Sequence, residues 1–166
     1  MEDLLEQAFD ALKSLPPVDR DRIAWEIIER VEDKTEWDRI IAMPASQLWM
    51  EGQARKTLQA YAKIQKKLTM TCVSIPLDHP PREQAYWTHF DDLPGEIREL
   101  AEENYRLWKE NPSHPGLRFK RIHETVPVFS FRVGMRHRTV GVESEDGKVV
   151  WFWVGSFETF QALVGG

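Results

Sequence analysis

The chain has 166 residues, 42% of them hydrophobic and 30% charged, a balance that is ordinary for a globular protein. Its formal net charge of −5 argues against general coating of nucleic acid, although it allows one local basic site. The single cysteine, Cys72, cannot form an internal disulfide and fits a reducing cytoplasm. No apolar run approaches the ~20 residues that a membrane helix needs, so we expect a cytoplasmic protein without membrane contact.

The first part of the chain has apolar side chains at helical spacing, which predicts a series of helices. Pro17 can open the second helix, because its missing N–H would have no partner there, and Pro44 is expected to end the third. The fourth helix is long and mostly polar, with a narrow stripe at helical spacing formed by Leu58, Tyr61, Ile64 or Gln65, and Leu68. Such a stripe needs a partner surface, although periodicity alone favours an ordinary helical subdomain. The helices are expected at residues 2–14, 17–32, 35–43 and 46–68.

The second part of the chain changes from helical patterns to strand patterns. Residues 71–75 are expected to form a short strand, and residues 76–81 form a proline-rich loop. Two helices are expected next, at residues 84–90 and 94–110. Runs rich in β-branched and aromatic residues then predict an antiparallel sheet, with an Asp-Gly turn at residues 145–148. The strands of this sheet are expected at residues 117–124, 128–133, 137–143 and 149–154.

The predicted sheet is a basic island in an acidic chain. Between residues 113 and 140 there are six cations and one acid, Glu124. Because side chains alternate between the faces of a strand, Ser130 and Arg132 should share one face while Phe131 takes the other. We therefore expect one apolar face that packs on helices and one cationic face that is open. The cations of the island are Arg118, Lys120, Arg121, Arg132, Arg136 and Arg138.

Several motifs follow one another in a fixed order between residues 86 and 164. They are Leu93-Pro94, Asn111-Pro112-x-His114-Pro115-x-Leu117-x-Phe119-Lys120, Phe131-Arg132-Val133-Gly134, Arg138 and Trp151-Phe152-Trp153-Val154-Gly155-Ser156. Together they resemble the RelE/ParE superfamily of bacterial toxins, most closely the branch of cytotoxic translational repressors. The resemblance implies an α+β domain in which helices pack on a four-stranded antiparallel sheet. It also implies cleavage of mRNA without a metal or cofactor, usually on the ribosome, although a sister branch poisons DNA gyrase instead.

A second set of motifs lies in the first 60 residues. They are Leu15-Pro16-Pro17, Ile23-Ala24, Glu29, Glu32, Trp37-Asp38 and Leu48, and they resemble the small antitoxins that partner this toxin branch. The two resemblances divide the chain into an all-helical antitoxin-like segment, residues 1–69, and a toxin-like domain, residues 70–166. The chain is then either a natural fusion or two joined genes. The resemblance implies an intramolecular contact that silences the toxin in cis, and a homodimer is compatible with it. The contact is expected at Leu58, Tyr61 and Ile64.

Cleavage of RNA without a metal uses the ribose 2′-OH as the nucleophile. It needs a group that accepts the 2′ proton, cations that hold the charged transition state and an acid for the departing 5′ oxygen. The resemblance places Arg132 and Arg138 on the scissile phosphate, and Lys120 matches a recurrent lysine at the start of the sheet. A single strand arginine is usually only a solvated side chain, so this assignment depends on the cluster. Further RNA contacts are expected at Arg118, Arg121 and Arg136.

Two positions depart from the family pattern. Where this branch usually has a histidine and, three residues later, a tyrosine, this chain has Phe157 and Phe160. Phenylalanine cannot transfer a proton, so either another histidine substitutes, or the arginines alone give slow cleavage, or the domain no longer cleaves. We expect the last strand to carry Phe157 to the rim of the sheet that displays Arg132 and Arg138, so Phe157→His should raise the activity. The competing interpretation is an apolar core edge formed with Phe160 and Leu163, where histidine would only destabilise the domain.

These departures leave the activity open between two classes of function. One is a weakened mRNA endoribonuclease, and the other is an inactive module for binding or dimerisation; a gyrase-targeting toxin is a third alternative. The histidines of the island also have structural explanations. His114 is expected to turn its loop, while His123 and His137 are expected to satisfy local hydrogen bonds. No spacing of His, Cys, Asp or Glu in the sequence resembles a metal site.

Overall fold

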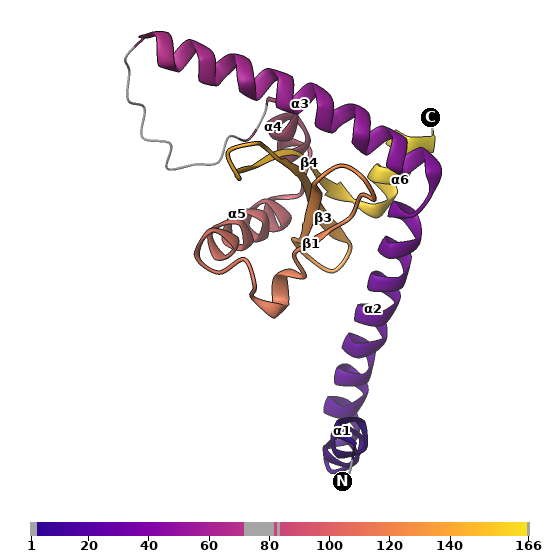
Figure 1. The fold of residues 1–166 in the computed structure, drawn as a ribbon. Coiled ribbons are helices and arrows are strands. Elements are labelled where there is room, and N and C mark those ends of the chain that lie inside the picture. Colours follow the sequence, from indigo (N-terminus) through magenta and orange to yellow (C-terminus); the bar gives the residue numbers. More distant parts are fainter. Residues whose placement is uncertain (1–2, 72–81, 83, 166) are drawn as a thin grey trace. The chain divides into compact units, whose positions relative to one another are not determined.

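The computed structural model describes residues 3–71, 82 and 84–165. The chain divides into two compact units, Met1–Trp37 and Asp38–Gly166. The boundary between residues 69 and 70 was predicted from the antitoxin-like and toxin-like motifs, and it stays a prediction. The larger unit is a mixed helix and sheet structure, which confirms the predicted α+β class (Figure 1).

The smaller unit consists of helix α1 (Leu4–Lys13) and most of helix α2 (Pro17–Ile41). The expected break after residue 32 is wrong, because α2 continues through it without interruption. No glycine or proline occurs between residues 18 and 43, so nothing there stops a helix. Thr35 does not cap a new helix; its hydroxyl donates a hydrogen bond of 2.9 Å to the Val31 carbonyl within α2.

Helix α3 (Pro44–Thr71) begins at the proline that was expected to end the preceding helix. Its first turn ties down the end of α2: the Ser46 hydroxyl donates to the Ile40 carbonyl at 2.6 Å, and the Gln47 amide donates to the Ile41 carbonyl at 2.6 Å. These bonds satisfy carbonyls that a helix end leaves open. The strand expected from residue 71 is wrong at that residue, which is helical, and the rest of that strand and the loop at 76–81 lie outside the described residues.

A four-stranded antiparallel sheet in the order β1-β2-β3-β4 confirms the predicted sheet. The first strand is much shorter than expected, because a 3-10 turn and a left-handed residue, Arg118 with φ 47°, precede it. The predicted Asp-Gly turn is present, with Gly147 at φ +78°. The strands are β1 (Lys120–Arg121), β2 (Val128–Arg132), β3 (His137–Glu143) and β4 (Val149–Ser156).

One face of the sheet packs against helix α5 (Gly95–Glu110), and helix α4 (Gln84–Asp91) packs against β4 (Figure 1). Trp108 of α5 is at the centre of this core: its ring stacks on Phe131 with the centroids 6.2 Å apart and meets Trp151 edge-on at 5.0 Å. Aromatic pairs of this kind add to the burial of their apolar area. The helices expected at residues 84–90 and 94–110 are therefore confirmed with small differences at their ends.

The opposite face is covered by α3 and by helix α6 (Phe157–Gly165), which sequence patterns did not predict. Phe160 of α6 meets Trp49 of α3 at 5.3 Å between ring centroids and Trp153 of β4 at 5.1 Å. Ser156 starts α6 by accepting a hydrogen bond from the Thr159 backbone N–H at 3.2 Å. The expectation of an open cationic face is wrong. Apolar residues such as Val140 lie on the same face as Arg138, and α3 and α6 pack against them.

A β-bulge sets which residues of β4 point to each face. The register shifts between Val140 and Gly141, so that Phe152 is an extra residue on β4. Residues two positions apart on a regular strand point to the same face. Because of the extra residue, Trp151 packs toward α5 whereas Trp153 packs toward α6. A Cβ on Gly141 would lie 2.6 Å from Cε3 of Trp151, so only glycine fits at this point. Among the described helices, none is long and apolar enough to cross a bilayer.

Candidate functional site

The structure brings together two of the arginines that the sequence singled out. Arg132 of β2 and Arg138 of β3 are direct partners in the antiparallel register, so their side chains share one face. Both donate to the carbonyl of Gly134, Arg132 from Nε at 3.1 Å and Arg138 from Nη1 at 3.3 Å. Arg138 is 3% exposed and Arg132 is half-buried. Like charges directly opposite each other on a sheet are unfavourable, so an anion at this place would be stabilising.

Phe157 lies beside this pair at the start of α6. Its ring is fully buried, and the guanidinium carbon of Arg138 lies over it at 5.2 Å from the ring centroid. The guanidinium carbon of Arg136 lies over the same ring at 5.3 Å. Phe160 is fully buried as well, whereas Leu163 is 38% exposed. Phe157 thus both reaches the arginines, as one interpretation predicted, and belongs to the core, as the other predicted.

Glu158, the second residue of α6, adds a carboxylate that the sequence did not mark as part of the site. Its Oε1 accepts hydrogen bonds from Arg136 Nε at 3.1 Å and Nη2 at 2.6 Å. The hydrogen bond from its own backbone N–H, and then those from Arg136, lower the pKa of Glu158 below its ordinary value. We name Arg132, Arg136, Arg138, Phe157 and Glu158 together the arginine cluster.

His137 is the histidine nearest to the arginine cluster. It precedes Arg138 on β3 and is paired with Ser156 in the register. Burial lowers the pKa of His137, and the charges of Arg138 and Arg136 lower it further, while Glu158 opposes them. The ring is therefore neutral near pH 7 and able to accept a proton.

The other two histidines of the island have the structural roles that were predicted. His123 is buried; its Nε2 is 2.9 Å from the Gln47 carbonyl, and its Nδ1 accepts from the backbone N–H groups of Thr125 and Val126. The double acceptance at Nδ1 requires the proton on Nε2, so both ring nitrogens are engaged. His114 accepts from the backbone N–H of Gly116 at 3.1 Å and turns its loop.

The remaining predicted cations lie at β1 and not in the arginine cluster. Lys120 is opposite Ser130, on the face that carries Arg132, and forms an ion pair with Asp38. Arg121 is exposed and donates to the His123 carbonyl at 3.2 Å, and Arg118 is exposed in the turn before the sheet. The structure therefore groups Arg132, Arg136 and Arg138 and leaves Arg118 and Arg121 apart from them.

Burial along the stripe of α3 differs from one predicted residue to the next, while its role as an antitoxin contact stays a prediction. Tyr61 is buried at 5% exposure and Leu58 is half-buried, but the expected burial of Ile64 is wrong, because it is 52% exposed. A helix turns about 100° per residue, so Leu58 and Ile64 point about 120° apart and cannot share one narrow stripe. Gln65 takes the place expected for Ile64.

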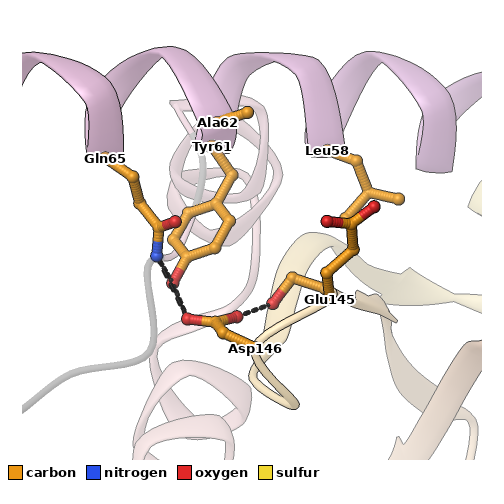
Figure 2. A pocket seen from close by; sticks show the side chains of 7 residues that line it. Leu58, Tyr61, Ala62, Gln65, Glu145 and Asp146 are labelled. Atoms are coloured by element: carbon orange, nitrogen blue, oxygen red, sulfur yellow. Dashed lines mark hydrogen bonds between the residues drawn. The ribbon is translucent and has the colours of Figure 1, made fainter.

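An anchor at the far end of α3 was missed by sequence reasoning. Asp146, in the turn between β3 and β4, accepts hydrogen bonds from Tyr61 at 3.0 Å and Gln65 at 3.1 Å, and Figure 2 shows these side chains converging on it. The Ser144 hydroxyl also donates to it. These bonds, that of Ser144 foremost, lower the pKa of Asp146 to about 2. A cavity of about 480 Å³ lies beside the anchor, lined also by Leu58, Ala62 and Glu145.

A second missed cluster surrounds Arg82. Its side chain is 8% exposed, binds Glu102 through both terminal nitrogens and lies over the ring of Tyr105 at 3.7 Å from the centroid. Burial raises the pKa of Tyr105 and Tyr86 to about 12, although Arg82 opposes it. The described side-chain partners of Arg82 lie on α4 and α5, and its backbone forms a β-bridge with Trp151 of β4, so we assign the cluster a structural role. Arg82 and Glu102 lie 20 positions apart in the sequence, and no local pattern of residues indicates that they pair.

A scan of protein-family models, a search of curated proteins and a search of solved structures each returned no match. Among the described residues, no group of three or more His, Cys, Asp or Glu side chains could hold a metal ion.

Proposed function

We propose that the chain is a fused toxin–antitoxin protein whose toxin-like domain, residues 70–166, binds RNA through the arginine cluster and cleaves it weakly. The observation that carries the proposal is the placement of Arg132 and Arg138 opposite each other, with Arg136 over the same ring as Arg138. Guanidinium groups remain charged and bind phosphate oxygens with a planar fork. Arg132 and Arg138 meet at the Gly134 carbonyl, and Arg136 and Arg138 share the Phe157 ring, so this group of cations favours a phosphodiester.

The chemistry follows from these groups. The ribose 2′ oxygen attacks the adjacent phosphorus, the bond to the 5′ oxygen breaks, and a 2′,3′-cyclic phosphate forms. The arginines stabilise the negative charge that develops on the phosphate oxygens. His137 precedes Arg138 on β3, so its ring points to the opposite face of the sheet, and water accepts the 2′ proton. Phe157 supplies no acid for the departing 5′ oxygen, so water must protonate it and cleavage is slow.

The position of α3 supports silencing in cis. Most of this helix belongs to the antitoxin-like segment, and it packs on β3, β4 and α6 of the toxin-like domain. It covers the face of the sheet from which Arg132 and Arg138 project. Arg138 is 3% exposed in the whole chain, so a phosphate could reach it only after the chain around it opens. The whole chain should therefore act on RNA less than a fragment in which this face is uncovered.

One observation favours a second function, an inactive binding module. Both Phe157 and Phe160 are fully buried, at the two positions where the resembled family has side chains that can transfer protons. In such a module the arginine cluster would hold RNA without cleaving it. The two functions differ in products, because only the first forms a cyclic phosphate.

The test follows cleavage of end-labelled RNA in the presence of EDTA by the whole chain and by residues 38–166 and 70–166. The fragment 38–166 is the larger compact unit, whereas 70–166 lacks α3 and uncovers the cluster. We expect slow cleavage by 70–166, its loss in Arg138→Ala, and none in RNA with a 2′-deoxy sugar at the scissile position. Thermal melts check that each fragment is folded. Binding without products would select the inactive module, and neither binding nor cleavage by a folded fragment would refute both.

A further inference from the structure

We infer that Phe157 is a positioning residue whose ring holds the guanidinium groups of Arg136 and Arg138 in the orientation that receives a phosphate. The inference rests on the proposed function and deepens it. It gives Phe157 a role of its own in place of a lost proton-transfer group. The two guanidinium carbons lie 5.3 Å and 5.2 Å from the centroid of one ring. Both distances are within the range of about 6 Å over which a cation is attracted by an aromatic face.

The ring is rigidly placed, which a positioning residue requires. It is fully buried and belongs to the first residue of α6, where its backbone N–H donates to the Arg136 carbonyl at 3.1 Å. The same start of α6 is capped by Ser156, whose hydroxyl accepts from the Thr159 N–H. The helix cap and the bond to Arg136 therefore hold the backbone of Phe157, and the packing around the buried ring holds its side chain. Burial also removes water from the ring, which strengthens its attraction for a cation.

A fixed ring matters because arginine side chains are long and flexible. An unrestrained arginine loses rotamer freedom when it binds a phosphate, and that loss weakens binding. Arg138 is restrained by two backbone carbonyls, those of Gly134 at 3.3 Å and His137 at 3.0 Å, and by the ring of Phe157. An arginine that is already oriented loses less freedom when the phosphate arrives.

Glu158 lies in the same cluster as a competing anion. Both Nε and Nη2 of Arg136 donate to one of its carboxylate oxygens, which is how a phosphate oxygen would be bound. A phosphate that binds Arg136 must displace this carboxylate. Glu158→Gln should therefore tighten the binding of phosphate and RNA, whereas loss of the Phe157 ring should weaken it.

The experiment compares whole-chain variants by NMR of the arginine Nε–H signals. Binding of a single-stranded RNA at low salt is measured on the same whole-chain variants and on fragments 70–166 that thermal melts show to be folded. Phe157→Leu removes the ring, and pentafluorophenylalanine at position 157 keeps its shape while reversing the charge of its face. Phe160→Leu is the matched control, because Phe160 is equally buried in α6 but packs on Trp49 and Trp153. The ring of Phe157 should shift the Nε–H signals of Arg136 and Arg138.

We expect Phe157→Leu to remove these shifts and pentafluorophenylalanine to change them. Both changes should weaken RNA binding about three- to tenfold, as a cation–aromatic contact of this kind predicts. Phe160→Leu should lower the melting temperature and leave the shifts and the binding constant unchanged. Unshifted arginine signals in the native chain, or RNA binding that Phe157→Leu does not alter, would overturn the inference. If the arginine signals are shifted but neither the native chain nor a folded fragment 70–166 binds RNA at low salt, the proposed function fails while the placement of the arginines by the ring stands.

Discussion

The anchor between α3 and the β3–β4 turn yields a prediction whose size follows from the structure. Asp146→Ala removes the acceptor of the bonds from Tyr61, Gln65 and Ser144. The pKa of Asp146 falls from 3.8 to about 2, which would correspond to roughly 2 kcal/mol if the group were buried. Its side chain is 36% exposed, and solvent screening reduces the contribution to about 1 kcal/mol. With lost hydrogen bonds included, we expect a destabilisation of about 1–2 kcal/mol.

Thermal and urea unfolding of the whole chain measure this effect. A loss of 1 kcal/mol corresponds to roughly 2–4 °C in melting temperature for a chain of this size. Because the folded pKa of Asp146 is depressed, its contribution is complete above pH 3.8 and disappears as the pH falls to about 2. Glu145→Ala is the control, since Glu145 lies in the same turn and makes none of these bonds. Equal melting of the Asp146→Ala and Glu145→Ala proteins, or full additivity of Asp146→Ala with Tyr61→Phe, would refute the reasoning.

Four further changes test the core and the arginine cluster. Gly141→Ala should destabilise the chain by about 1–3 kcal/mol, because its Cβ would lie 2.6 Å from a ring carbon of Trp151. Arg82→Met should cost about 1–3 kcal/mol, because it removes the ring contact and both bonds to Glu102. Phe157→His should lower the melting temperature without raising RNA cleavage, because the native ring is fully buried. His137→Gln should reduce the loss of stability on acidification, because the depressed pKa of His137 favours the unfolded state as the pH falls below 6.5.

Each of these changes has an outcome that would contradict it. A Gly141→Ala protein as stable as the native chain would mean that the bulge can relax around a Cβ. If the Arg82→Met protein unfolds at the same urea concentration as the native chain, the contacts of Arg82 with Tyr105 and Glu102 do not stabilise the fold. Faster cleavage by Phe157→His at an unchanged melting temperature would restore the interpretation of a lost catalytic group. Melting temperatures measured at pH 7 and pH 5 that fall equally in native and His137→Gln proteins would remove His137 as a source of pH dependence.

The sequence by itself was sufficient for the class of fold and for much of the sheet. Strands β2, β3 and β4 were predicted because runs of β-branched and aromatic residues have few other stable conformations. The turn at Gly147 was predicted because a position with positive φ favours glycine, and the roles of His114 and His123 followed from short-range hydrogen bonding. The pairing of Arg132 with Arg138 is a consequence of the register of two neighbouring strands joined by a short connection.

Tertiary structure decided what covers the sheet and which side chains meet. One extra residue on β4, Phe152, interrupts the alternation of faces, so Trp151 and Trp153 pack in opposite layers. The predicted open face was closed by α3 and α6, because the alternate residues of a four-stranded sheet leave apolar area on both sides. The anchor at Asp146 joins residues 81 and 85 positions apart in the chain. Contacts at such separations depend on the packing of whole elements, and no local pattern of residues encodes them.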